Sequence, residues 1–173
     1  VMVALPTFVE EDGDTLRTLV AGKHKYVFQT QGPLVFVMVA STGESETHMV
    51  LQLNYVFNQI LYVLTLAQLQ RIFKQQPGFD LRRMLGGTEK FVDSLLDLFD
   101  TDPSFFLGAV RCLPLGNTVR DKIGQVLLNH KTPSLVFALL ITDNQLVALL
   151  RPKKYSLHPA DVHLIFNNVT SKA

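Results

Sequence analysis

Apolar residues in the first part of the chain follow a two-residue repeat. Segments 15–20 and 25–30 alternate apolar with polar side chains, as half-buried strands do, and Gln31-Gly32-Pro33 marks a turn before the apolar run Leu34–Ala40. An uninterrupted apolar run flanked by turns predicts a central strand covered on both faces. Residues 15–41 therefore predict a three-stranded meander.

The spacing then changes to a helical one. Apolar side chains recur every three or four positions from Met49 to Leu64, which predicts a helix of about five turns. Its expected polar side carries amides rather than charges, namely Gln52, Asn58 and Gln59. Residues 66–75 predict a second helix that stops before Pro77.

Three more helices are predicted from apolar stripes, two of them before Pro114 and one after it. The stripes are Phe91, Leu95, Leu98 and Phe99; then Phe106, Val110 and Leu113 behind a first-turn Pro103; then Val119, Ile123, Val126 and Leu127, ending near Asn129. Leu113-Pro114-Leu115-Gly116 is the predicted boundary between the second and third of these helices.

The last part of the chain predicts a hairpin and a helix. Two apolar strands, 134–142 and 145–151, are joined by Asp143-Asn144, which has the length and chemistry of a two-residue turn. Pro159 opens a helix whose expected inner stripe is Val162, Ile165, Phe166 and Val169. The order helix, strand, strand, helix thus occurs around 1–64 and again around 117–169, which suggests two related α/β units.

Composition excludes some classes of function. The 173 residues are 47% hydrophobic and 18% charged with a net charge of +1, which argues against a disordered tail and against a dedicated nucleic-acid binder. Mean hydropathy is +0.22, a surplus that predicts a partner protein. Apolar runs are too short for a membrane span, and the first residues lack the charges of a signal peptide, so we expect a cytosolic chain.

Catalytic and metal-binding patterns are weak. The lone Cys112 lies in an apolar stretch that predicts a buried structural cysteine, and no G-x-S-x-G occurs. His158 and His163 would stand about 140° apart on a helix, so no metal site or cofactor is expected. The basic pairs Arg82-Arg83 and Lys153-Lys154 fit a solvated face, an acidic partner or anionic lipid.

Several strings resemble the SAND, or Mon-one, family of vacuolar fusion proteins. They are 79–87 (FDLRRMLGG), 111–115 (RCLPL), 144–151 (NQLVALLR) and 157–166 (LHPADVHLIF), with 10–17 and 21–25 most like the fungal members. The resemblance runs almost end to end and in the same order.

This resemblance implies a fold and a function. The fold would be α/β, a longin fold with an antiparallel sheet flanked by helices, with residues 1–114 as a first longin domain lacking its opening strands and 115–173 as the front of a second. The function would be that of a heterodimeric guanine nucleotide exchange factor, built with a companion longin subunit of the Ccz-one type, that activates a late-endosomal or vacuolar Rab GTPase. Such a subunit performs no covalent chemistry, and it would be cytoplasmic and peripheral on those membranes, through parts expected to be absent here.

Longin pairs generally present a surface made from their first helices and adjacent strands, which implies a set of partner-facing residues here. They are Thr7, Phe8, Glu10, Glu11, Arg17 and Lys23. A core position for Phe8 and solvated acids remain the alternative. Two other functions also stay open: a longin adaptor that binds a GTPase without exchange, and an enzyme with a polar pocket at His24, His48 or Cys112.

Overall fold

The computed structural model describes Pro6 and residues 15–171. By its internal contacts the chain divides into two compact units, Val1–Val92 and Asp93–Ala173, and the division falls inside helix α5 (Glu89–Thr101). Each unit combines an antiparallel sheet with helices, so the predicted α/β class is confirmed.

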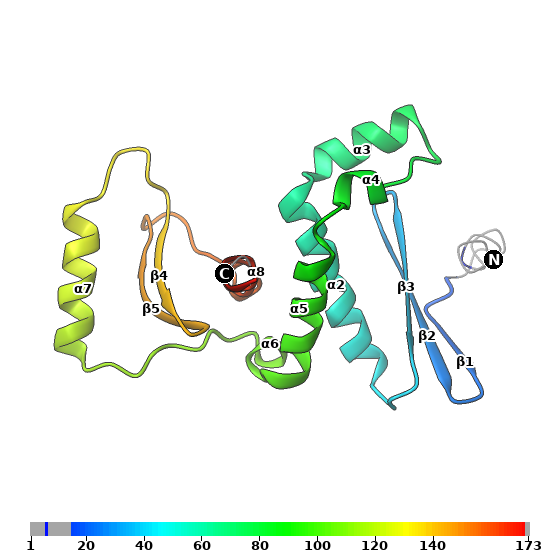
Figure 1. Ribbon diagram of the computed structural model, residues 1–173, viewed down its shortest axis with the longest axis horizontal. Coiled ribbons are helices and arrows are strands. Elements are labelled where there is room, and N and C mark those ends of the chain that lie inside the picture. The colour runs from blue at the N-terminus through cyan, green and yellow to red at the C-terminus, as the bar shows by residue number, and fades with distance from the viewer. Residues whose placement is uncertain (1–5, 7–14, 172–173) are drawn as a thin grey trace. The chain divides into compact units, whose positions relative to one another are not determined.

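The sheet of the first unit is the predicted meander. Strands β1 (Thr18–Ala21), β2 (His24–Gln31) and β3 (Leu34–Ala40) pair antiparallel in the order β1-β2-β3 (Figure 1). Gly22 and Gly32 open the two tight turns with φ of 60° and 58°, a left-handed conformation that glycine adopts without the steric cost of a Cβ. Tight turns of this kind make neighbouring strands antiparallel, which is why the sequence predicted the meander correctly.

The sequence predicted that Leu34–Ala40 is a central strand covered on both faces. This prediction was wrong for the sheet that the structure describes. β3 pairs only with β2 among the described residues, so it lies at the end of the sheet rather than in its centre. Its Val39 is 51% exposed, and most of its other side chains are half-buried. An unbroken apolar run indicates that a segment favours burial, but it does not identify the strand or helix that covers the segment.

The two helices predicted after the meander are confirmed. Helix α2 spans Glu46–Val63 and helix α3 spans Leu66–Gln75. A capping box starts α3: Gln68 N–H donates to the Thr65 hydroxyl at 3.2 Å, and Thr65 N–H donates to the Gln68 side chain at 2.9 Å. A short helix, α4 (Arg82–Leu85), follows.

The core of the first unit lies between α2 and one face of the sheet. Val27, Met49 and Leu53 are buried there and pack with half-buried Phe36 and Met38. The polar side predicted for α2 was partly wrong, because Gln52 and Gln59 are 4% and 1% exposed. The helix is buried over more of its circumference than its apolar stripe indicates, so some amides lie inside.

The length and hydropathy of the described helices determine whether any of them could cross a membrane. None of them alone is both long and apolar enough to cross a bilayer. Helices α2 and α3 satisfy the length and hydropathy criteria only when taken together, as a pair bent by 84°.

In the second unit the helix predicted behind Pro103 is much shorter than expected. Helix α6 spans only Ser104–Leu107, because Gly108 takes a left-handed conformation with φ of 56° and ends it. The burial was also misassigned: Phe105 is 4% exposed, whereas the predicted inner residue Phe106 is 47% exposed.

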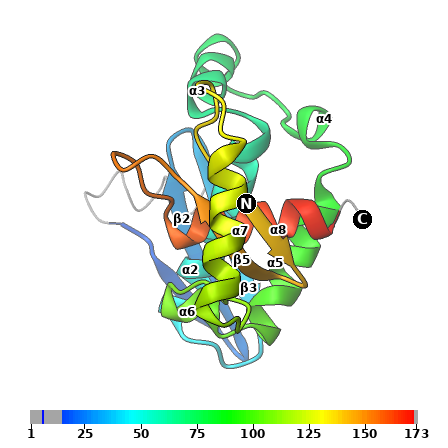
Figure 2. The same ribbon diagram turned by 90° about the vertical axis from the view of Figure 1, so that its left-hand side faces the viewer.

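The rest of the second unit is a hairpin with a helix on each side. Strands β4 (Ala138–Thr142) and β5 (Gln145–Leu150) form the predicted hairpin, and helices α7 (Asn117–Asn129) and α8 (Pro159–Thr170) flank it (Figures 1 and 2). Asp143 and Asn144 both have positive φ, as a two-residue turn of type I′ requires. β4 begins four residues later than predicted.

Candidate partner interface

The residues predicted to face a partner fall into two groups. Thr7, Phe8, Glu10 and Glu11 lie outside the described residues, so their predicted role stays a prediction. Arg17 and Lys23 are described, and both side chains are exposed. They lie on either side of β1, and at roughly 3.3 Å per strand residue they stand well over 10 Å apart. The structure therefore places them along one strand rather than in one cluster.

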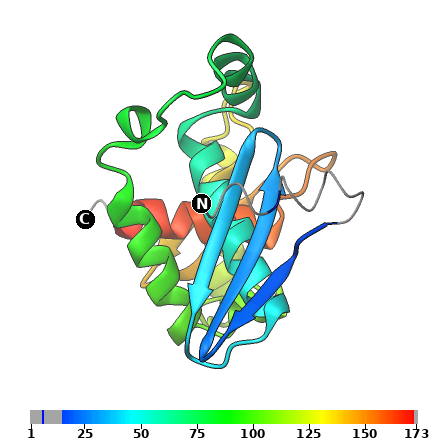
Figure 3. The same cartoon turned by 90° about the vertical axis from the view of Figure 1, so that its right-hand side faces the viewer.

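Strand β1 is the outer strand of its sheet. It pairs with β2 in the register Thr18 with Val27 through Ala21 with His24, and no other described strand pairs with it (Figure 3). Just before the strand, the Arg17 carbonyl accepts a hydrogen bond from Phe28 N–H at 2.9 Å. An outer strand presents backbone donors and acceptors that a second chain can pair with.

The side chains of β1 are suited to a protein contact. Leu19 and Val20 are 39% and 66% exposed between the two cations Arg17 and Lys23. No aspartate or glutamate occurs from residue 15 to residue 43, and a third cation, Lys25, donates to the Glu44 carbonyl. This edge is therefore apolar at its centre and positive at both ends, which favours a partner with negative charge.

Beside β1, strand β2 is fixed to α2 by a pair of amide hydrogen bonds. Gln29 and Gln31 both donate from Nε2 to Asn54 Oδ1, at 2.7 Å and 3.2 Å. The two glutamines are two positions apart, so they share a face of the strand, and α2 covers that face. These amide hydrogen bonds fix α2 to the sheet whose outer strand is β1. Their partnership could not be read from the sequence because the pairs are more than twenty residues apart.

In the second unit the structure brings together a serine, a histidine and an aspartate that the sequence analysis did not connect. Ser104 Oγ lies 3.4 Å from His163 Nε2, and the Asp102 carboxylate accepts from Ser104 N–H at 2.9 Å and lies 3.8 Å from Arg111. His163 also stacks on Phe105, with ring centroids 4.2 Å apart. The arrangement contains the residue types of a hydrolase triad.

Its geometry does not match that chemistry. His163 Nε2 lies 2.8 Å from the Ala109 carbonyl, and a carbonyl can only accept, so this nitrogen carries the proton and cannot take one from Ser104. Burial lowers the pKa of His163, although the Ala109 hydrogen bond and the Asp102 charge act in the opposite direction. The Asp102 carboxylate is instead held in a local turn, in which it accepts from Ser104 N–H two residues later. This cluster fastens α6 to α8.

The enzyme alternative rested on a polar pocket at His24, His48 or Cys112. Cys112 is exposed, so the buried cysteine that the sequence predicted was wrong. The segment around it forms a single parallel bridge with Leu146, in which Leu113 N–H donates to Leu146 O at 3.0 Å and the sulfur is left at the surface. His24 is exposed and His48 half-buried in the other unit. Among residues 15–171, no three histidine, cysteine or acidic side chains could hold a metal ion together.

Comparison with known proteins gives the family. The family described as the first longin domain of FUZ, MON1 and HPS1 matches residues 1–95, and the second longin domain of the same proteins matches residues 133–173. The chain belongs to the MON1/SAND family of longin proteins. This confirms both the predicted resemblance and the longin fold.

Individual relatives agree with this membership. Vacuolar fusion protein MON1 homolog A of Gallus gallus is 47% identical over the whole chain, Protein SAND of Takifugu rubripes 43% over the whole chain, and Vacuolar fusion protein MON1 of Yarrowia lipolytica 42% over 94% of it. These matches cover 32%, 33% and 31% of the relatives, so the chain spans about a third of their length.

Proposed function

We propose that this MON1/SAND chain is part of a guanine nucleotide exchange factor that acts in trafficking to the vacuole. It would assemble with a companion longin subunit of the Ccz-one type and activate a late-endosomal or vacuolar Rab GTPase. The names of its relatives support the vacuolar role. The outer edge of β1, with which no other described strand pairs and which is apolar between two cations, is the observation that carries the proposal, because assembly and GTPase binding both need an exposed surface of this kind.

Exchange by this route needs differential binding and no covalent step. A factor that prefers the nucleotide-free GTPase to the nucleotide-bound form speeds release, and each tenfold gain needs about 1.4 kcal/mol of preference. A thousandfold gain therefore needs about 4 kcal/mol, which a few central interface residues can supply. No acid, base or nucleophile is required on the surface that binds.

The domain organisation that goes with this proposal has a first longin domain over residues 1–114 and the front part of a second over 115–173. The family matches end at residue 95 and resume at residue 133. Residues 96–132, which include α6 and α7, lie between the two matches. The proposed boundary at Pro114 falls within this stretch.

The test is release of a fluorescent nucleotide from the Rab GTPase, measured with the full-length subunit, with its companion, and with both. We expect fast release only with both. The double reversal E10K/E11K should slow release by at least about tenfold, because it reverses the sign of two charges proposed to face a partner. The matched control D93K/D97K changes the same charge on exposed positions of α5. Unchanged release by an intact E10K/E11K heterodimer would sink the assignment of this surface.

The described edge is tested in the same assay. R17E/K23E should weaken assembly or slow release, whereas K122E/K131E, at exposed positions of the second unit, should do neither. The second candidate function, a longin adaptor, predicts that the GTPase binds the heterodimer with no change in release rate. Binding measured beside release distinguishes the two functions.

A further inference from the structure

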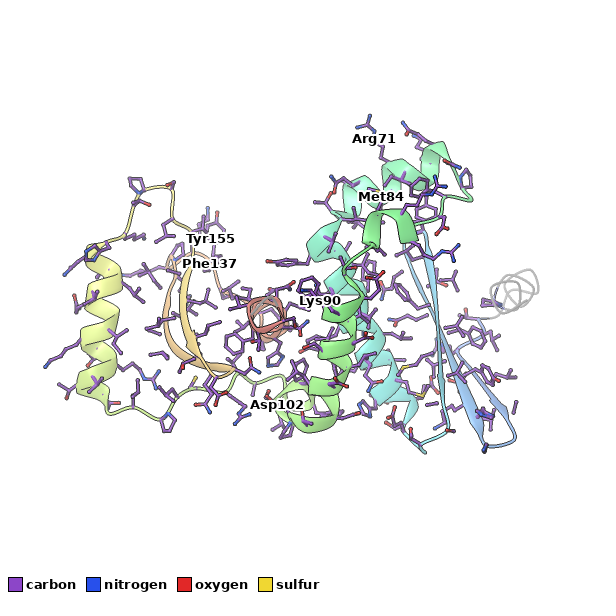
Figure 4. All side chains as sticks on the ribbon, in the orientation of Figure 1. Arg71, Met84, Lys90, Asp102, Phe137 and Tyr155 are labelled. Carbon is purple, nitrogen blue, oxygen red and sulfur yellow. The ribbon has the colours of Figure 1, made fainter. Side chains whose placement is uncertain are left out.

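The loop between β5 and α8 carries a serine that follows two lysines. Residues 151–158 connect the two elements, and their sequence is RPKKYSLH. Lys153, Lys154, Tyr155 and Ser156 are all exposed. Tyr155 lies at the end of the hairpin opposite the turn between β4 and β5 (Figure 4). The serine is therefore at the surface of the second unit, where another protein can reach it.

The loop is strongly basic. Arg151, Lys153 and Lys154 give it three positive charges, and no aspartate or glutamate occurs from residue 144 to residue 160. Among the described residues none of these three cations takes part in an ion pair. Arg151 donates to the Tyr155 carbonyl at 3.1 Å, and Lys154 Nζ lies 5.8 Å from the centre of the Tyr155 ring. The charges of the two lysines are thus available to an acidic surface.

Few bonds hold the serine and its neighbours in one conformation. Tyr155 N–H donates to the Pro152 carbonyl at 3.3 Å, which closes a turn, and the Ser156 hydroxyl makes no hydrogen bond to the residues that the structure describes. Leu157 is half-buried, and His158 is extended and caps α8, with Nδ1 accepting from the Ala160 N–H at 3.2 Å. A surface loop with so few backbone bonds opens at a low free-energy cost. Residues 153–157 can therefore enter the substrate groove of an enzyme in an extended form.

We propose that Ser156 is a phosphorylation site for a serine/threonine kinase that selects basic substrates. The carboxylates in the substrate groove of such a kinase bind cations two and three positions before the serine, where Lys154 and Lys153 stand. Leu157, directly after the serine, supplies an apolar contact. The Ser156 Oγ attacks the γ-phosphorus of ATP as the bond from that phosphorus to the β,γ-bridging oxygen breaks. ADP leaves, and the hydroxyl proton passes to the catalytic aspartate of the kinase.

The surroundings of Ser156 favour the product. A phosphoserine carries about −1.5 to −2 charges at neutral pH. Arg151, Lys153 and Lys154 offset this charge, and so does the positive end of α8, which begins three residues after the serine. Phosphorylation lowers the charge of the loop from +3 to about +1, so it weakens any contact of this loop with an anionic partner.

The test is phosphorylation of the full-length protein by the catalytic subunit of cyclic-AMP-dependent protein kinase with ATP and Mg²⁺. Mass spectrometry of peptides locates the phosphate and follows its appearance with time. We expect phosphate on Ser156, and at least about tenfold slower phosphorylation of Ser156 in K153E/K154E, because like charges then face each other in the groove. K122E/K131E makes the same charge change at exposed positions elsewhere in the second unit and should leave the rate unchanged.

A second pair of variants tests the serine itself. S156A should remove the phosphate from this peptide, whereas S41A, at an exposed serine with no cation at the three preceding positions, should keep it. Circular dichroism checks that each variant is folded. Absence of phosphate from Ser156 would overturn the proposal, as would equal rates for K153E/K154E and K122E/K131E. A loop held closed by Leu157 would give the first of these results. The assay contains no GTPase or companion subunit, so its outcome is independent of the exchange activity proposed above.

Discussion

Arg120 shows how one side chain completes an irregular strand pairing. In the hairpin Leu140 pairs with Ala148 and Ile141 with Leu146, so Val147 is an extra residue in β5. Arg120 on α7 donates from Nη1 to the Val147 carbonyl at 2.6 Å and from Nη2 to the Leu113 carbonyl at 2.5 Å. One guanidinium thus supplies the donors for two carbonyls and ties α7 to β5.

Replacing this residue should destabilise the protein. We expect R120M to lower the free energy of unfolding by about 1–3 kcal/mol, because both carbonyls lose their donor. K122M, an exposed position on the same helix, should change it by less than about 0.5 kcal/mol. Urea denaturation of the two variants measures the difference. Equal losses would show that the guanidinium bonds contribute nothing beyond the alkyl chain.

His163 should make stability depend on pH. Its pKa is lowered in the folded protein by burial, so between the ordinary value of about 6.5 and the lower folded value the unfolded chain binds the proton more strongly. Its contribution to stability is therefore complete above about pH 6.5 and is lost as pH falls through the folded pKa. The slope is at most about 1.4 kcal/mol per pH unit.

Denaturation between about pH 7 and pH 5 checks this sign. H163Q should flatten the pH dependence, because it removes the buried titrating group and keeps a donor for the Ala109 carbonyl. H24Q, at an exposed histidine, should leave it as in the unchanged protein. A pH dependence that survives in H163Q would assign the effect to other groups.

At the scale of elements, turn chemistry and capping residues were the most reliable sequence signals. Both positions of the Asp143-Asn144 turn are left-handed, with φ of 46° and 54°, and the α3 capping box lies where Thr65 and Gln68 indicate. Such signals depend on one to four neighbouring residues and need no tertiary partner. Asn144 is also tied to α8, since its Oδ1 accepts from the Thr170 hydroxyl at 2.8 Å.

The turn offers a matched pair of variants at Asp143. D143G should match or exceed the stability of the unchanged protein, because glycine adopts positive φ freely. D143V should be less stable than D143G by about 1–2 kcal/mol, because a β-branched side chain is strained there. Thermal denaturation of the pair measures the difference. Equal stability would mean that the turn changes conformation in the variants.

Helix length and helix burial were predicted less well than turns. The apolar stripe behind Pro103 extended to Leu113, but Gly108 ends α6 after four residues. In α8 the inner stripe was right for Val162 and Phe166 and wrong for Val169, which is 52% exposed. His163, Asn167 and Asn168 are buried instead. Their polar atoms have partners inside, such as Leu164 O for Asn168 Nδ2 at 2.7 Å, and polarity alone gives no sign of such partners.

At the scale of the whole molecule, the two units and the two family matches agree on a chain with two longin parts. The surplus of apolar residues has a physical explanation in side chains that no described element covers. Val20 on β1, Val119 and Val126 on α7, and Val136 before β4 are all at least 50% exposed. Surfaces of this kind fit a subunit that works inside an assembly.

The sequence by itself determined the family, the order of strands and helices, and the turns, because those depend on local chemistry and on motifs that lie within a few residues. Only the tertiary structure decided which polar groups are inside, that Cys112 is outside, and that Ser104 and His163 meet without forming a catalytic site. The reason is that burial and partnership are set by residues far along the chain, as between Gln29 and Asn54 or Arg120 and Val147. A local pattern indicates that a side chain favours burial or a hydrogen-bond partner. Whether the side chain is buried or paired depends on the contacts that it makes in the folded chain.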